Sequence, residues 1–117
     1  MPKKSPDRAR DEALQRIAKI QEALSTFEFV CSGTLLERTK ICGKPGCRCA
    51  EDPEARHGPY YEWTRRHNGK LLHRVVTAEQ AQVIRRAIKN HRAILTLLRR
   101  WEAETVHMLD ALKEPKR

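Results

Sequence analysis

Three cysteines within eight residues are the feature of this sequence with the clearest chemistry. Cys42, Cys47 and Cys49 form a C-x4-C-x-C run that has Pro45 and Gly46 at its middle. A Pro-Gly pair favours a tight turn, which returns the first cysteine toward the second. In an extended C-x-C segment both cysteines face the same side and can reach one ion. The run therefore predicts a structural zinc site, which takes four tetrahedral thiolate or imidazole ligands.

Three cysteines leave one ligand to find, and two residues compete for that position. His57 lies eight residues after the run, directly before a Gly-Pro pair that favours a turn. Cys31 lies eleven residues before the run, and its place in an alternating apolar segment also fits a small core residue. We favour His57 and keep Cys31 as the alternative. An iron–sulfur cluster is a rival to zinc, and it would require Cys31 as its fourth cysteine.

Basic residues are concentrated in the middle of the chain. The 117 residues include 24 Lys and Arg against 15 Asp and Glu, a net charge of +9. Residues 38–101 alone hold fifteen basic and five acidic side chains, a net +10, whereas residues 1–37 are neutral and 102–117 carry −1. A concentrated positive field attracts polyanions, so the distribution predicts a nucleic-acid partner.

The basic residues fall on the cysteine run, around a predicted hairpin and along a predicted helix. Arg85, Lys89 and Arg92 share one helix face by their 4-3 spacing, which could follow a phosphate backbone but also fits a solvated surface. The candidate phosphate-binding residues are Arg38, Lys44, Arg48, Arg65, Arg66, Lys70, Arg74, Arg85, Arg86, Lys89 and Arg92.

The spacing of apolar residues predicts a small α+β protein. Apolar positions at 4-3-4 steps favour a helix over residues 8–25. Apolar residues at every second position from residue 27 favour an extended segment over 27–41. Residues 42–59 have the composition of a loop without its own core. Asn68-Gly69 favours a two-residue turn and hence a hairpin over 60–76. A zinc-stapled hairpin module between two helices is the expected fold.

The last predicted element is a long helix. Thr77 and Gln80 fit a capping box, and neither Pro nor Gly occurs from there to about residue 112, which predicts a helix of roughly 50 Å. Its apolar residues recur at alternating steps of three and four, as in a coiled-coil seam. We expect this seam to pack on the N-terminal helix, on a second subunit or on both. The seam comprises Ile84, Ala87, His91, Ile94, Leu98, Trp101, Thr105, Met108 and Leu112.

These elements divide the chain into three expected parts within a single domain. Residues 1–26 hold the N-terminal helix, 27–76 the β-rich zinc module and 77–117 the C-terminal helix. No apolar run reaches the ~20 residues of a membrane span, and the N-terminus has no apolar signal core, so we expect a cytoplasmic protein without a membrane partner.

The motif around the cysteines resembles a known family. Three segments carry the resemblance: Gly33-Thr34-Leu35-Leu36-Glu37-Arg38, then Cys42-Gly43-Lys44-Pro45-Gly46-Cys47-Arg48-Cys49-Ala50, then His57-Gly58-Pro59-Tyr60-Tyr61. They are similar to a small prokaryotic domain family that is often found with transposases and other mobile elements. The resemblance implies a cysteine/histidine site at Cys42, Cys47, Cys49 and His57, and a DNA-related setting. It implies no particular activity.

The main hypothesis is a non-enzymatic, zinc-containing protein that binds nucleic acid. We expect the nucleic acid to be DNA, and we expect a homodimer that forms through its helices and associates with the nucleoid. The sequence contains no evident pair of catalytic carboxylates, phosphate-binding loop or nucleophile–base pair that would indicate an enzyme. The alternative is a zinc-stabilised adaptor or dimerisation module for a transposase or regulator. An iron–sulfur redox sensor is the third hypothesis.

Overall fold

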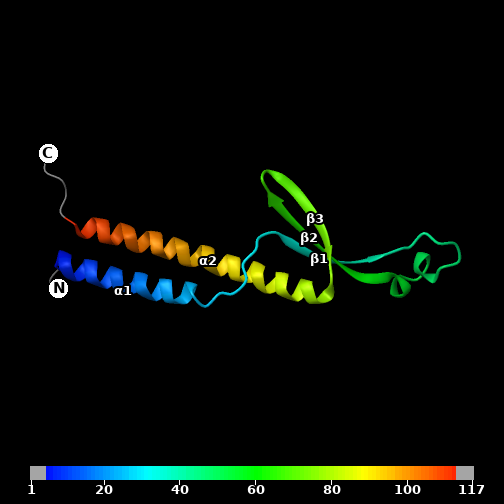
Figure 1. The fold of residues 1–117 in the computed structure, drawn as a ribbon, viewed down its shortest axis with the longest axis horizontal. Coiled ribbons are helices and arrows are strands. Elements are labelled where there is room, and N and C mark those ends of the chain that lie inside the picture. The colour runs from blue at the N-terminus through cyan, green and yellow to red at the C-terminus, as the bar shows by residue number, and fades with distance from the viewer. Residues whose placement is uncertain (1–4, 113–117) are drawn as a thin grey trace. The chain divides into compact units, whose positions relative to one another are not determined.

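The structure, a computed structural model, describes residues 5–112 (Figure 1). It contains helix α1 (Pro6–Leu24), strands β1 (Thr34–Lys40), β2 (His57–His67) and β3 (Lys70–Val76), and helix α2 (Ala78–Ala111). Two short 3-10 turns, Arg48–Ala50 and Pro53–Ala55, lie between β1 and β2. The expected α+β class, with an N-terminal helix, a β module and a long C-terminal helix, is confirmed.

The chain forms two compact units, which are described separately. The helical unit consists of the chain up to Glu28 together with the chain from Arg92 onward, and the sheet unit is Phe29–His91. The expected division of a single domain into three parts stays a prediction, and its outermost residues, 1–4 and 113–117, lie outside the described residues. Within residues 5–112, no helix is both long enough and apolar enough to span a bilayer.

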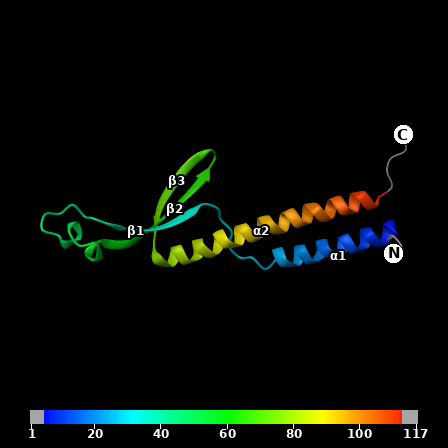
Figure 2. The same cartoon turned by 180° about the vertical axis from the view of Figure 1, so that it is seen from behind.

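The sheet unit is built on three antiparallel strands with β2 at the centre (Figure 2). Strands β2 and β3 pair from His67 opposite Lys70 to Tyr61 opposite Val76. Their connection is the predicted two-residue turn, in which Asn68 and Gly69 both have positive φ, at 50° and 77°. This confirms the hairpin, because such turns match the twist of the strands they join.

One face of the sheet forms a small core with the start of α2. Val76, Ala81 and Ile84 are buried there, and half-buried apolar side chains including Leu35 and Trp63 pack against them. The start of α2 is fixed by the predicted capping box. The Thr77 N–H donates to Gln80 Oε1 at 2.9 Å, and the Gln80 N–H donates to Thr77 Oγ1 at 3.0 Å.

The segment before β1 differs from the sequence prediction. Alternating apolar residues predicted a strand reaching Cys31, but residues 27–32 adopt no regular secondary structure. Within the sheet unit, the Cys31 N–H donates to the Ala87 carbonyl at 3.3 Å, and Asn90 Nδ2 donates to the Phe29 carbonyl at 2.9 Å. The segment satisfies backbone groups against α2 instead of against a neighbouring strand.

In the helical unit, α1 lies antiparallel to the C-terminal part of α2 (Figure 1). Helix α1 begins where Ser5 Oγ accepts a hydrogen bond from the Arg8 N–H at 3.2 Å. Its residues Ala13, Ile17 and Ile20 are buried, as the 4-3-4 spacing predicted. The apolar face of α1 is therefore the face that packs in this unit.

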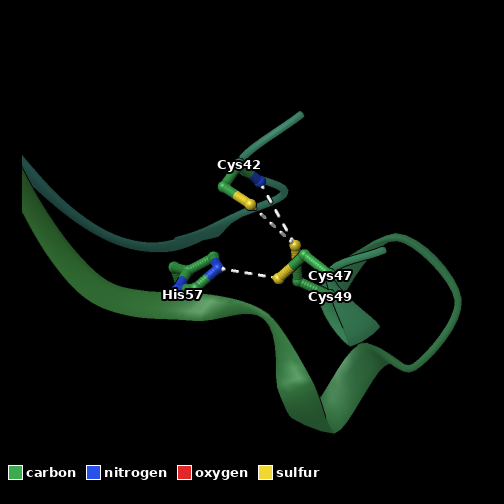
Figure 3. A group of neighbouring side chains, drawn as sticks. All are labelled: Cys42, Cys47, Cys49 and His57. Carbon is green, nitrogen blue, oxygen red and sulfur yellow. Dashed lines mark hydrogen bonds between the residues drawn. The ribbon is translucent and has the colours of Figure 1, made fainter. Parts of the chain in front are cut away.

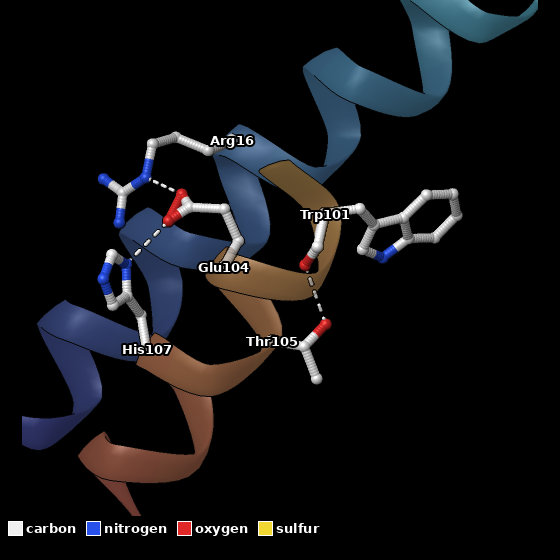
Figure 4. A network of polar contacts seen from close by, with 5 residues as sticks. All are labelled: Arg16, Trp101, Glu104, Thr105 and His107. Atoms are coloured by element: carbon white, nitrogen blue, oxygen red, sulfur yellow. Dashed lines mark hydrogen bonds and ion pairs between the residues drawn. The ribbon is translucent and has the colours of Figure 1, made fainter. Parts of the chain in front are cut away.

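A polar network joins the two helices of this unit (Figure 4). Glu104 of α2 is only 7% exposed, and its carboxylate accepts a hydrogen bond from Arg16 Nε of α1. Its second oxygen lies 2.8 Å from His107 Nδ1. The bond from Arg16 is the main reason why the pKa of Glu104 is lowered, and the contact with His107 adds to it. The network pins one register of α1 along α2.

This network predicts a pH-dependent contribution to stability. Because the folded-state pKa of Glu104 is lowered, its contribution is complete above the ordinary glutamate value of 4.5 and is lost as the pH falls through the folded-state value. Thermal unfolding of the wild type and Glu104→Gln between pH 7 and pH 3 measures it. We expect the variant to melt at a lower temperature at pH 7 and the difference to shrink toward pH 3. An equal difference at both pH values would contradict the assignment.

Candidate metal centre

Three of the predicted zinc ligands lie on the loop between β1 and β2, and the fourth, His57, is the first residue of β2. The turn at the middle of the loop forms as expected: the Cys47 N–H donates to the Lys44 carbonyl at 3.3 Å, and Gly46 has a φ of +78°. A residue with a side chain rarely adopts this conformation, so glycine suits the position. The chain then enters the 3-10 turn Arg48–Ala50, which turns Cys49 inward until it is 1% exposed.

Four side chains converge at this loop: Cys42, Cys47, Cys49 and His57 (Figure 3). Their ligand atoms all lie within 4.8 Å of one another. Cys42 Sγ is 3.5 Å from Cys49 Sγ, and Cys47 Sγ is 3.3 Å from His57 Nε2. The cluster could hold a metal ion, and it contains the set that both the spacing and the family resemblance indicated.

The spacing of these atoms fits a tetrahedral ion. Zinc bonds of about 2.3 Å to sulfur and 2.0 Å to nitrogen separate neighbouring ligand atoms by roughly 3.6–3.8 Å. Two of the separations, at 3.3 and 3.5 Å, lie close to that value. Closing the widest separation, 4.8 Å, requires a movement of about 1 Å. Small side-chain rotations would complete the site.

The local electrostatics favour a thiolate at one of these positions. The pKa of Cys47 is lowered, first by a hydrogen bond from the Cys49 backbone and then by the neighbouring thiols of Cys49 and Cys42. A hydrogen bond from the Cys42 backbone acts to lower the pKa of Cys49, but burial and the adjacent thiols outweigh it and raise the value. Because metal ligands must be deprotonated, the lowered pKa of Cys47 favours metal binding at this thiol.

His57 is positioned by the sheet. It is the first residue of β2 and pairs with Lys40 at the end of β1. Close approach to β1 continues at Gly58, where an added Cβ would meet the Arg38 carbonyl at 2.9 Å, and the φ of +127° also favours glycine. The hairpin was predicted to begin only at residue 60, so the extension of β2 back to the ligand is a correction.

Cys31 lies outside the cluster of candidate ligands. It packs against the core of Val76, Ala81 and Ile84, and its Sγ lies 3.9 Å from the Ile84 carbonyl. Burial raises the pKa of its thiol. The four-cysteine set that the iron–sulfur alternative required is therefore not brought together.

The candidate phosphate-binding residues do not all have free side chains. Arg38 pairs with Glu62 at 3.8 Å, and Arg48 pairs with Asp52 at 3.1 Å. Arg65 and Arg85 lie over aromatic rings. Within residues 5–112 the other candidates of the sheet unit are exposed without an ion-pair partner: Lys44, Arg66, Lys70, Arg74, Arg86 and Lys89. Arg92, in the helical unit, is also exposed.

Three aromatic rings of the sheet unit each face a cation. Lys40 Nζ lies 4.9 Å from the centre of the Tyr60 ring, Arg65 lies 4.8 Å from that of Trp63, and Arg85 lies 5.7 Å from that of Tyr61. These contacts hold the cations against the sheet. Lys40 was not among the candidate residues, although its position two residues before the first cysteine could have indicated it.

Comparison with known proteins identifies the family. Residues 8–86 match a domain of unknown function (DUF6788), and because this covers most of the chain, the protein belongs to the DUF6788 family. The match includes α1 except its first two residues, the whole sheet, the cysteine/histidine cluster and the first turns of α2. No curated protein and no solved structure matches the chain.

Proposed function

We propose that the cluster of Cys42, Cys47, Cys49 and His57 binds one structural Zn²⁺ and that the module it stabilises binds nucleic acid without catalysing a reaction. The observation that carries the proposal is the convergence of three sulfurs and one imidazole within 4.8 Å. Three thiolates and one imidazole form a ligand set typical of structural zinc. Neutral imidazole and soft sulfur do not suit Mg²⁺ or Ca²⁺, which prefer oxygen.

Charge supports nucleic acid as the partner. The sheet unit, Phe29–His91, holds twelve Lys and Arg against six Asp and Glu, a net charge of +6. Arg66 and Lys70 flank the exposed turn of the hairpin, where a two-stranded ribbon could enter a DNA groove. A DNA target in the nucleoid also agrees with the mobile-element setting implied by the resemblance of the cysteine motif.

The dependence of affinity on salt tests this function. If the six candidate residues of the sheet unit that are exposed without an ion-pair partner contact phosphates, log K should fall with log salt at a slope of about −5. Fluorescence anisotropy of a labelled DNA duplex, titrated with zinc-loaded protein at several salt concentrations, measures the slope. A slope near zero would rule out phosphate binding.

A pair of charge variants then locates the binding surface. Replacing Arg66 and Lys70 together with Gln should reduce the slope by about 2, because each lost phosphate contact removes roughly one unit. The control replaces Arg10 and Lys19 of α1, which removes the same net charge from the helical unit. If both double variants change the slope equally, net charge alone explains the binding and the hairpin is not the contact surface.

A further inference from the structure

Helix α2 carries an exposed apolar stripe in the helical unit. Its large apolar side chains, between 40% and 58% exposed, are Leu95, Leu98, Val106 and Leu109, and Leu112 directly after the helix is equally exposed. Positions 95, 98, 102, 105 and 109 follow steps of 3-4-3-4, which place them on one helix face, and Leu112 continues this spacing one residue beyond the helix. We call this face the outer stripe. Glu102 and Thr105 occupy its middle, and Val106 borders it.

The outer stripe faces away from α1. Helix α1 covers the side of α2 that carries Glu104 and Ala111, which lie beside Arg16 and Ala9. Position 104 is about half a turn from position 102, so the middle of the outer stripe lies on the side of the helix away from α1. In Figure 4, Trp101 likewise projects away from the contact between Arg16 and Glu104.

This arrangement divides the seam predicted from the sequence. The seam was expected to pack as one surface, but Leu98, Thr105 and Leu112 of that seam belong to the outer stripe, which α1 leaves uncovered. Exposed apolar stripes of this extent mark interaction surfaces. The remaining question is which partner covers it.

We propose that a second copy of this chain covers the outer stripe, with the two α2 helices antiparallel. In the register that centres the dyad between positions 103 and 104, Leu98 of each copy faces Leu109 of the other, and Leu95 faces Leu112. Glu102 then faces Thr105. All apolar residues of the stripe meet apolar residues, as a self-complementary two-fold interface requires.

Charges beside the stripe favour the same partner and the same direction. Arg99 and Asp110 are exposed, and neither has an ion-pair partner in the described part of the chain. In the antiparallel register, Arg99 of one copy lies level with position 108 of the other, about 3 Å along the axis from Asp110 on the same side. The two-fold axis creates this pair twice. A parallel arrangement would place the two Arg99 side chains on opposite edges of the interface, where neither meets Asp110 of the other copy.

The test uses the full chain loaded with zinc, in sedimentation equilibrium over a range of protein concentrations. We expect the wild type to form a dimer, and Leu98→Glu and Leu109→Lys each to weaken dimerisation at least about 100-fold. Combining the two changes places each new Glu opposite a new Lys of the other copy, and it should recover at least about tenfold of the lost affinity. Leu14→Glu, which alters an exposed leucine of α1, is the matched control and should leave the dimer intact.

Each alternative result overturns the proposal. A wild type that remains monomeric at the highest concentration excludes a second copy as the partner, and binding of its stripe to another protein or to lipid vesicles would then identify a different one. A double variant no stronger than the single variants excludes the antiparallel register. Far-UV circular dichroism checks that each variant stays helical. If Leu98→Glu loses its helical structure, Val106→Glu, at the border of the stripe, tests the same interface.

Discussion

The variant Cys49→Ser is expected to abolish stoichiometric zinc binding and to disorder the loop that joins β1 to β2. Cys49 is the most buried of the four candidate ligands, and its sulfur lies near Cys42. Serine leaves an ion with three ligands and an open position. Zinc binding provides about 10–16 kcal/mol of apparent folding free energy in small zinc-finger peptides, so its loss should be the largest effect of any single substitution here.

Elemental analysis of protein purified without added metal measures this prediction. The wild type should contain one zinc per chain and Cys49→Ser far less. Cys31→Ser is the matched control, because Cys31 lies in the same unit but outside the cluster, and this variant should retain its zinc. Equal zinc contents in all three proteins, or none in the wild type, would refute the metal centre. NMR spectra of the backbone amides in the loop provide a second measurement of how well the loop is ordered.

The second large effect is expected at Trp63. Its ring packs against the core of the sheet unit, lies under Arg65, and donates from Nε1 to the Ser32 carbonyl at 3.0 Å. Trp63→Ala should lower the free energy of unfolding by about 3 kcal/mol, at the low end for a tryptophan because the ring is only half-buried. Urea unfolding of the zinc-loaded protein, followed by circular dichroism, provides the value.

Two further variants separate the contributions of this side chain. Trp63→Phe keeps an aromatic ring but loses the hydrogen bond to Ser32, and it should cost about 1 kcal/mol. Tyr60→Ala removes an exposed ring on the other face of the sheet and should cost less than Trp63→Ala. If Tyr60→Ala is more destabilising than Trp63→Ala, the result would contradict the assignment of the core to the face of the sheet that carries Trp63.

Features that depend on short stretches of sequence could be predicted. The capping box of Thr77 and Gln80, the turn at Asn68-Gly69 and the turn at Gly46 all form as expected, because each is determined by the residues within it. The clustering of His57 with three cysteines was also predicted, since two short turns are enough to bring these residues together.

Features that depend on distant partners could not be predicted in the same way. Gly58-Pro59 looked like the end of a loop, but pairing with β1 extends β2 back to His57. Phe29 and Cys31 alternate as in a strand, yet their backbone groups bond to α2. Arg16 and Glu104 form an ion pair across 88 positions in sequence, a contact that the local pattern of neither helix indicates. In each case a tertiary contact overrides the local pattern.

The length of β2 has a consequence for how the sheet unit would open. This strand has eleven residues and both its neighbours have seven, so its first residues pair only with β1. Opening without the ion would therefore begin at the end near His57 and proceed toward Trp63, where β3 supports the strand from the other side. Amide hydrogen exchange along β2 should therefore be graded, from fast near His57, where it depends on the ion, to slow near Trp63, where both neighbouring strands pair with β2.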